Sequence, residues 1–230
     1  MNWKWKLCRL GGVDLYLHWT LAFLLLWVGM GGFMAGAGVL GVTVSLVCVA
    51  MLFGLVVMHE FAHAWAARAV GIGTHSITLL PIGGVAQLAG SPSKPRHELL
   101  IAAAGPASNL ALAAILGPLA ATATSPLAHV LLSYLISANL MLALFNLLPA
   151  FPMDGGRMLR AALAERGGGL WATHVATRVS MGVAILLGLW GLATLQLGLM
   201  LIAAYVWLAA SVENATVGYF GGFARQPRRW

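Results

Sequence analysis

The chain has 230 residues, of which 60% are hydrophobic and only 8% are charged. A typical soluble domain carries about 25% charged residues, so the composition excludes an ordinary soluble protein. The formal net charge of +7 does not indicate nucleic-acid binding, because the basic residues gather on one side of the predicted membrane spans.

Several apolar runs reach the roughly 20 residues that a helix needs to span a bilayer. The first predicted span covers about residues 15–36, and its length favours a retained helix over a cleaved signal peptide. A Gly-rich stretch at residues 76–90 is too short and too broken for a span and predicts an extended or re-entrant segment. The other spans are predicted at about residues 39–68, 98–121 and 127–148, with two more in 171–212 hinged near Thr194 to Gly198.

The sequence therefore predicts an all-α polytopic membrane protein with six transmembrane helices and a short re-entrant β-like segment between helices two and three. No internal repeat or soluble segment interrupts it, which predicts one domain over residues 1–230. All 13 Lys and Arg residues fall on one side of the six spans. The positive-inside rule then places both termini in the cytoplasm, in a multi-pass protein of the cell (inner) membrane.

The second predicted span ends in the stretch VMHEFAHAW, where His59 and His63 are four residues apart. At 3.6 residues per turn, both imidazoles lie on one face of a helix and can reach one metal ion. Glu60 can then act on a water at that metal. This is the H-E-x-x-H pattern of zinc hydrolases, in which the metal lowers the pKa of water and the glutamate takes its proton.

A chance match is one alternative for these three residues, and a pore-lining or helix-pairing role is another. His59 lies about ten residues before Arg68, which is roughly 15 Å from the predicted helix end. A charged side chain within the membrane costs about 2.5–3.5 kcal/mol on insertion scales and needs a reason to persist. This cost favours a functional site.

A catalytic zinc usually has three protein ligands, so a third ligand is expected. Among the acidic residues, Asp154 is the best candidate. Pro149 and Pro152 end the preceding helix, and Gly155 and Gly156 let the backbone turn beside the second span. The other acidic side chains suit helix ends, ion pairs or the membrane entrance: Asp14, Glu98, Glu165 and Glu213.

The two motifs together resemble the site-2 protease family of intramembrane zinc metalloproteases. That family pairs HExxH in one membrane helix with N-x-x-P-x-x-x-x-D-G in a later one. Here the two motifs are HEFAH at His59–His63 and NLLPAFPMDG at Asn146–Gly155. PIGGVAQL resembles the family's re-entrant segment, and AGPASNL at Ala104–Leu110 resembles its third-helix motif.

The resemblance implies that His59, His63 and Asp154 bind one Zn²⁺ per chain and that Glu60 is the general base. It implies that Asn146 holds the substrate or polarises the developing oxyanion, with a helix–helix hydrogen bond as the alternative.

The re-entrant segment would bind an unwound substrate by strand addition, with a plain turn as the alternative. Its predicted substrate-binding residues are Pro81, Ile82, Gly83, Gly84 and Val85. Helix packing is the predicted role of Gly105, Pro106, Ser108 and Asn109.

The resemblance thus predicts a minimal intramembrane zinc endopeptidase, without room for a PDZ or CBS domain. It would cleave a single-span membrane-bound regulatory protein. Its other predicted partners are membrane lipid and either a regulatory membrane protein or a second copy of the chain. One alternative is a metal-ion transporter that uses the same His and Asp cluster. Another is a catalytically inactive membrane scaffold. Glu60 distinguishes the peptidase from the transporter, because a transporter does not need a general base at this position.

Overall fold

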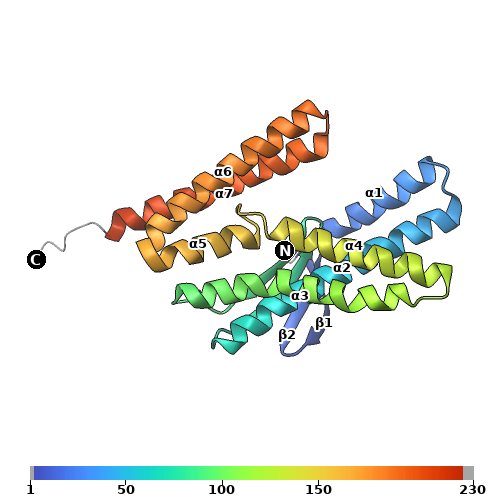
Figure 1. Ribbon diagram of the computed structural model, residues 1–230, viewed down its shortest axis with the longest axis horizontal. Helices are drawn as coiled ribbons and strands as arrows, with labels where there is room; N and C mark the ends of the chain where they lie inside the picture. Colours follow the sequence, from blue (N-terminus) through green and yellow to red (C-terminus); the bar gives the residue numbers. More distant parts are fainter. Residues whose placement is uncertain (1–2, 225–230) are drawn as a thin grey trace, which may run out of the picture. The chain divides into compact units, whose positions relative to one another are not determined.

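The computed structural model describes residues 3–224 of the chain, and side chains up to residue 216. This part of the chain forms seven helices and four short strands, and the ribbon is drawn in Figure 1. The strands are β1 (Lys4–Leu10), β2 (Val13–His18), β3 (Thr74–Leu80) and β4 (Gly83–Leu88). The helices are α1 (Thr20–Met34), α2 (Gly38–Ala69), α3 (Pro95–Ala121), α4 (Pro126–Asn146), α5 (Asp154–Gly167), α6 (Gly169–Ala193) and α7 (Leu197–Ala224).

Five of these helices, α2, α3, α4, α6 and α7, are long and apolar enough to cross a membrane. The prediction of a mostly helical polytopic protein is therefore confirmed. The sixth apolar helix, α1, has only 15 residues. At 1.5 Å per residue it is about 22 Å long, shorter than a hydrocarbon core of about 30 Å. Within the described residues, five helices rather than six thus meet the length criterion.

Residue contacts divide the chain into two compact units. Unit 1 comprises Met1–Ser91 and Ala104–Ala143, and unit 2 comprises Pro92–Ala103 and Leu144–Trp230. The helices α3 and α4 each contribute to both units. The prediction of one domain over residues 1–230 stays a prediction.

Unit 1 contains a four-stranded sheet in the order β1-β2-β3-β4. The β1–β2 and β3–β4 pairs are antiparallel hairpins, and β2 runs parallel to β3. Leu80 pairs with Gly83, so Pro81 and Ile82 form the turn of the second hairpin. The extended segment predicted from the sequence is this hairpin. The sheet also includes residues 4–18, which precede and overlap the start of the first predicted span at about residues 15–36.

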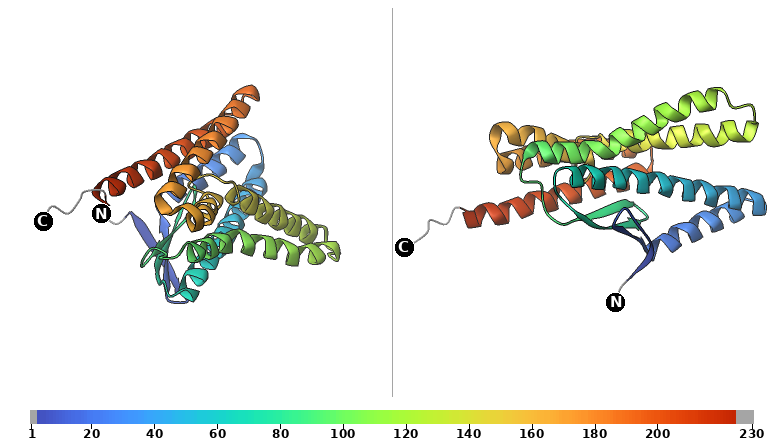
Figure 2. Two further views of the ribbon diagram at one scale, coloured as in Figure 1. Left: turned by 60° about the vertical axis from the view of Figure 1, so that its left-hand side comes forward. Right: turned by 90° about the horizontal axis from the view of Figure 1, so that it is seen from below.

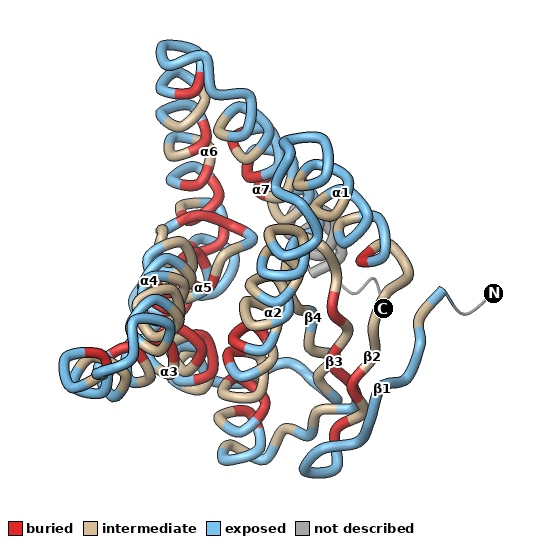
Figure 3. The backbone as a smooth tube through the Cα atoms, turned by 90° about the vertical axis from the view of Figure 1, so that its right-hand side faces the viewer, coloured by how far each residue is buried: buried red, intermediate tan, exposed pale blue. Residues whose placement is uncertain are grey.

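One face of the sheet packs against α2. Val13 and Leu15 of β2 and Ile77 and Leu79 of β3 form a buried cluster with Val56 of α2. Figure 3 shows buried positions in β3 and in the second half of α2, and Figure 2 shows the sheet running beside that helix. Because alternate strand residues point to one face, the alternation in VDLYLH is what buries this side of β2.

Unit 2 contains α5, α6 and α7. The two long helices α6 and α7 lie side by side, joined by a short connection (Figure 1). Ala150, in the turn before α5, packs with Ala184 of α6 and Val206 of α7. The helix α5 lies between the predicted spans at about residues 127–148 and 171–212, where the sequence predicts no helix. It begins at Asp154, and an acidic residue in a first helical turn is favoured by the helix dipole.

Candidate metal centre

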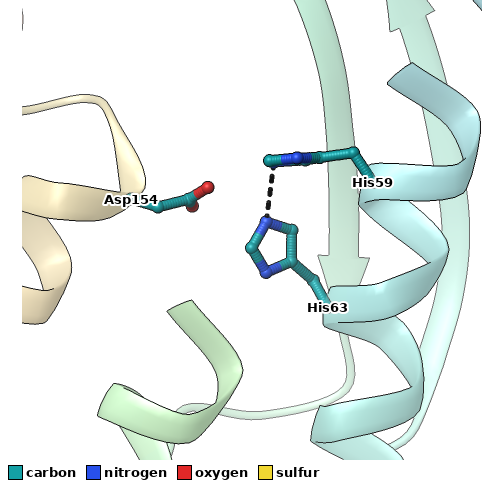
Figure 4. Close-up of side chains that lie close together, drawn as sticks. All are labelled: His59, His63 and Asp154. Carbon is teal, nitrogen blue, oxygen red and sulfur yellow. Dashed lines mark hydrogen bonds between the residues drawn. The ribbon is translucent and has the colours of Figure 1, made fainter. Parts of the chain in front are cut away.

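The two histidines of the H-E-x-x-H motif lie on one face of α2. Both are buried, with 5% of His59 and 8% of His63 exposed. Their Nε2 atoms are 3.0 Å apart, and the rings meet edge to face (Figure 4). The helical spacing has therefore brought two nitrogen donors to one point, as the sequence predicts.

The space beside the two Nε2 atoms is kept open by Gly105 of α3. A Cβ atom at this position would lie 2.3 Å from His63 Nε2 and 2.6 Å from His59 Nε2. Zinc–nitrogen bonds are about 2.0–2.1 Å long, so a methyl group at this position would take the place that a zinc ion bound to both Nε2 atoms needs. The histidine pair thus fits a metal ion.

Asp154 completes a set of three potential metal ligands. One ligand atom each of His59, His63 and Asp154 lies within 4.8 Å of the others, and all three residues are buried (Figure 4). This is the one such group of three or more among the residues that the structure describes. Two imidazoles and one carboxylate are a donor set that fits one zinc ion with an open position.

The position of Asp154 depends on its neighbours in unit 2. A Cβ atom on Gly155 would lie 2.3 Å from the Leu148 carbonyl oxygen and 2.4 Å from that of Leu147. The backbone N–H of Phe151 donates a hydrogen bond of 2.9 Å to Ser180 Oγ, which is itself fully buried. These contacts hold the turn that carries Asp154 to the start of α5.

Glu60 and Asn146, the predicted catalytic residues, are both partly buried. A Cβ atom on Gly84 would lie 2.4 Å from Glu60 Cγ and 2.9 Å from its Oε1, so β4 passes directly beside this carboxylate. Of the predicted substrate-binding residues, Ile82 and Val85 are exposed, with 75% and 57% of their surface accessible. Pro81, Gly83 and Gly84 are partly buried.

Two residues that the sequence analysis did not place at the site lie next to it. His59 Nδ1 is 2.6 Å from Asn109 Oδ1, and Asn109 in turn bonds Asn139 of α4. The sequence predicts a helix-packing role for Asn109 and no particular role for Asn139. Two asparagines within apolar spans are the signal that could have found them, because buried amides need partners in a membrane.

The other acidic residues weighed as ligands have ion-pair partners. Arg160 bonds both Glu98 and Glu213, and Arg96 bonds Glu165 at 2.9 Å. The Lys6 ammonium lies 2.7 Å from Asp14 Oδ1. This ion pair, together with the charge of Arg9, holds the pKa of the Asp14 carboxyl below its usual value. These pairings agree with the choice of Asp154 as the third potential ligand.

Comparison with known proteins assigns the chain to a family. The model of peptidase family M50 matches residues 47–126 and 117–189, a region that includes the histidine pair and Asp154. The chain belongs to peptidase family M50. The predicted resemblance to site-2 proteases is thereby confirmed, and with the five long apolar helices it makes the chain a multi-pass membrane protein.

Two curated relatives and one solved structure show how far the similarity extends. The chain is 34% identical over 219 residues to a zinc metalloprotease of Methanocaldococcus jannaschii, covering 94% of this chain and 62% of the relative. It is 27% identical over 169 residues to stage IV sporulation protein FB of Bacillus subtilis, covering 73% and 57%. The structure of a site-2 protease from M. jannaschii superimposes with a TM-score of 0.68 and 33% identity, covering 92% of this chain and 95% of that one. The chain thus spans less than two thirds of the length of both curated relatives.

Proposed function

We propose that the protein is a zinc endopeptidase that hydrolyses a peptide bond within a transmembrane segment of another membrane protein. The observation that carries this proposal is the buried His59, His63 and Asp154 group in a chain of peptidase family M50. The M. jannaschii relative, which is named as a zinc metalloprotease, supports the same metal.

His59 and His63 would each donate Nε2 to one zinc ion per chain, and Asp154 would donate a carboxylate oxygen. A bound zinc ion supplies Lewis acidity, which lowers the pKa of water toward 7 and polarises a carbonyl. Gly105 leaves the space beside the two Nε2 atoms free of a side chain, and α2 fixes the spacing of the imidazoles.

Glu60 is the proposed general base. It follows His59 directly on α2, and it accepts the proton of the attacking water and later returns a proton to the leaving amine. Asn146, at the end of α4, would donate its amide N–H to the oxygen that gains negative charge in the transition state. Both roles rest on the motif positions and on family membership.

The substrate is proposed to bind as an extended strand at β4. This strand is at the edge of the sheet, and its residue Gly84 lies against Glu60. Strand addition at an edge uses backbone hydrogen bonds and tolerates different side chains. Pro81 and Ile82 would form the entrance to this edge, and Gly83, Gly84 and Val85 its first pairing residues.

The topology proposed is that of an inner-membrane protein with both termini in the cytoplasm. It rests on the one-sided distribution of Lys and Arg, of which Arg225, Arg228 and Arg229 lie outside the described residues. Proposed partners are a single-span membrane-bound regulatory protein as substrate, membrane lipid, and a regulatory membrane partner or second copy of the chain. Nucleic acid is not among them.

The test is a cleavage assay on Glu60→Gln, with the zinc content measured on the same preparation. Glutamine keeps size and polarity but cannot accept the proton, and general acid–base contributions are typically 10²–10⁴-fold. Cleavage of a co-expressed single-span substrate should fall into that range while zinc stays at the wild-type level. Asp154→Asn is the matched variant, which should bind zinc more weakly instead, because a neutral amide is a poorer ligand than a carboxylate. If Glu60→Gln cleaves at the wild-type rate, the peptidase proposal fails and a metal transporter replaces it.

A further inference from the structure

A chain of hydrogen bonds runs from His59 through two buried asparagines to a backbone carbonyl. His59 Nδ1 is 2.6 Å from Asn109 Oδ1 on α3. Asn109 Nδ2 donates to Asn139 Oδ1 at 2.8 Å, and Asn139 Nδ2 donates to the Leu135 carbonyl oxygen at 2.8 Å, both on α4. Asn109 is 2% exposed and Asn139 is fully buried. All these residues belong to unit 1.

The carbonyl at the end of this hydrogen-bond chain fixes its direction. A backbone oxygen only accepts hydrogen bonds, so Asn139 must present its NH₂ group to Leu135. Its carbonyl oxygen therefore faces Asn109 and must receive an N–H there. Asn109 in turn presents its own oxygen to His59, and an oxygen that only accepts requires a proton on His59 Nδ1.

We propose that Asn109 and Asn139 are positioning residues that fix the tautomer and ring orientation of His59. A neutral imidazole with its proton on Nδ1 has its lone pair on Nε2. His59 Nε2 is the atom that approaches His63 Nε2 and the space beside Gly105. The hydrogen-bond chain thus presents a lone pair to the metal position, and it rests on the proposed role of His59 as a zinc ligand.

The apolar surroundings explain why the partners of His59 are amides rather than carboxylates. Metal-binding histidines in soluble proteins often bond a carboxylate through the second ring nitrogen. Here the partner lies in an apolar membrane-length helix, where a further negative charge is costly. An amide offers the same oxygen without charge, but its NH₂ group then needs an acceptor. Asn139 and the Leu135 carbonyl meet that need in turn.

The zinc affinity of substituted full-length protein tests the proposal. Leucine is close to asparagine in size and forms no hydrogen bond, so Asn109→Leu removes the acceptor of His59 Nδ1. Loss of such an outer partner typically weakens metal binding 10–100-fold, which a competing chelator would measure on detergent-purified protein. Asn139→Leu should weaken zinc binding less, because Asn109 can still accept from His59 in its absence.

Two further variants separate positioning from a general effect on folding. Tyr134→Phe is the control, because it removes a 2.7 Å hydrogen bond from the same helix α4 to the Cys48 carbonyl and should leave zinc affinity unchanged. The double variant Asn109→Leu/Asn139→Leu should bind zinc no more weakly than Asn109→Leu alone, since Asn139 acts through Asn109. Additive losses would contradict the proposal.

A direct measurement of the tautomer does not depend on any variant's folding. ¹⁵N spectra of the full-length wild-type chain with labelled histidine, recorded after the zinc has been removed, should show His59 protonated at Nδ1, with His59→Gln used for assignment. A proton on Nε2 would overturn the proposal. If the wild type itself binds no zinc, the proposed function fails. If the wild type and Asn109→Leu bind zinc equally, only this inference fails.

Discussion

The two units hold their potential metal ligands by different means. In unit 1, His59 and His63 are one turn apart on the regular 32-residue helix α2, and side chains complete their support. In unit 2, Asp154 follows an irregular turn, and the backbone itself is held. Gly155 approaches two carbonyl groups, and Ser180 accepts the Phe151 N–H.

This difference determines which substitutions will disturb each ligand. A ligand on a regular helix needs only its ring oriented, so the sensitive positions are those whose side chains touch the ring. A ligand after an irregular turn needs its backbone fixed, so residues with no contact to the carboxylate affect it as well. Substitutions of comparable size in the two units should therefore have different consequences for zinc binding and for stability.

The largest effect is expected for Gly105→Ala in unit 1. The added methyl group would lie 2.3 Å from His63 Nε2, in the space proposed for the metal. Zinc content, measured by elemental analysis, should fall from one per chain to near zero, and cleavage should be lost with it. The control is Gly117→Ala on the same helix, where an added Cβ has no neighbour within 4 Å. Full zinc retention in Gly105→Ala would show that the metal lies elsewhere.

The equivalent change in unit 2, Gly155→Ala, should affect stability and zinc together. Its Cβ would meet backbone oxygens at 2.3 and 2.4 Å, which cannot rotate away, so the turn must shift. Such overpacking typically costs about 1–3 kcal/mol, and the displaced Asp154 should bind zinc more weakly. Thermal unfolding and chelator competition measure the two effects. Gly182→Ala in α6, with open space around it, is the control. If Gly155→Ala unfolds at the wild-type temperature, the proposal that Asp154 depends on a fixed backbone, unlike the two histidines, is contradicted.

Hydropathy made the long spans predictable from the sequence. The predicted spans at about residues 39–68 and 127–148 agree closely with α2 and α4, and the hinge near Thr194 separates α6 from α7. A long apolar run predicts a membrane helix because a helix satisfies its own backbone hydrogen bonds and needs about 20 apolar residues to span the bilayer. The histidine pair was equally readable, because four-residue spacing determines the helix face.

The N-terminal hairpin and α5 were not predicted. Apolar and polar residues alternate over residues 13–18 as in a strand. These residues adjoin a long apolar run, however, and the hydropathy of that run favours a membrane span. The helix α5 is short and polar, so it gives no membrane signal. The hydrogen-bond chain through Asn109 and Asn139 was also missed. Its two contacts between helices join residues that are 50 and 30 positions apart in the sequence, and no local sequence pattern predicts such pairs.

A smaller effect is expected for Ser180→Ala, which tests the backbone support of unit 2. The change leaves the buried Phe151 N–H without its oxygen acceptor. Leaving a buried donor unsatisfied costs about 1–3 kcal/mol, and the same turn carries Asp154, so zinc affinity should also fall modestly. Unfolding in mixed micelles would measure the first effect. Ser211→Ala, which removes only a bond to the Trp207 carbonyl within α7, should change neither. Equal stability of the two variants would contradict the proposed support.

The smallest effect is expected for Asp14→Asn, in the strand β2 of unit 1. The Lys6 ammonium and Arg9 keep the pKa of the Asp14 carboxyl below its usual value of 3.8, so this ion pair stabilises the fold above that pH. The contribution should be lost as the pH falls through the lowered pKa, where wild type and variant should unfold at the same temperature. Because the pair lies at the surface, added salt should also reduce the difference at neutral pH. Melting curves at neutral and acid pH, each with low and high salt, measure this. A difference that persists in acid would show that Asn disturbs the packing of β2 rather than removing a charge.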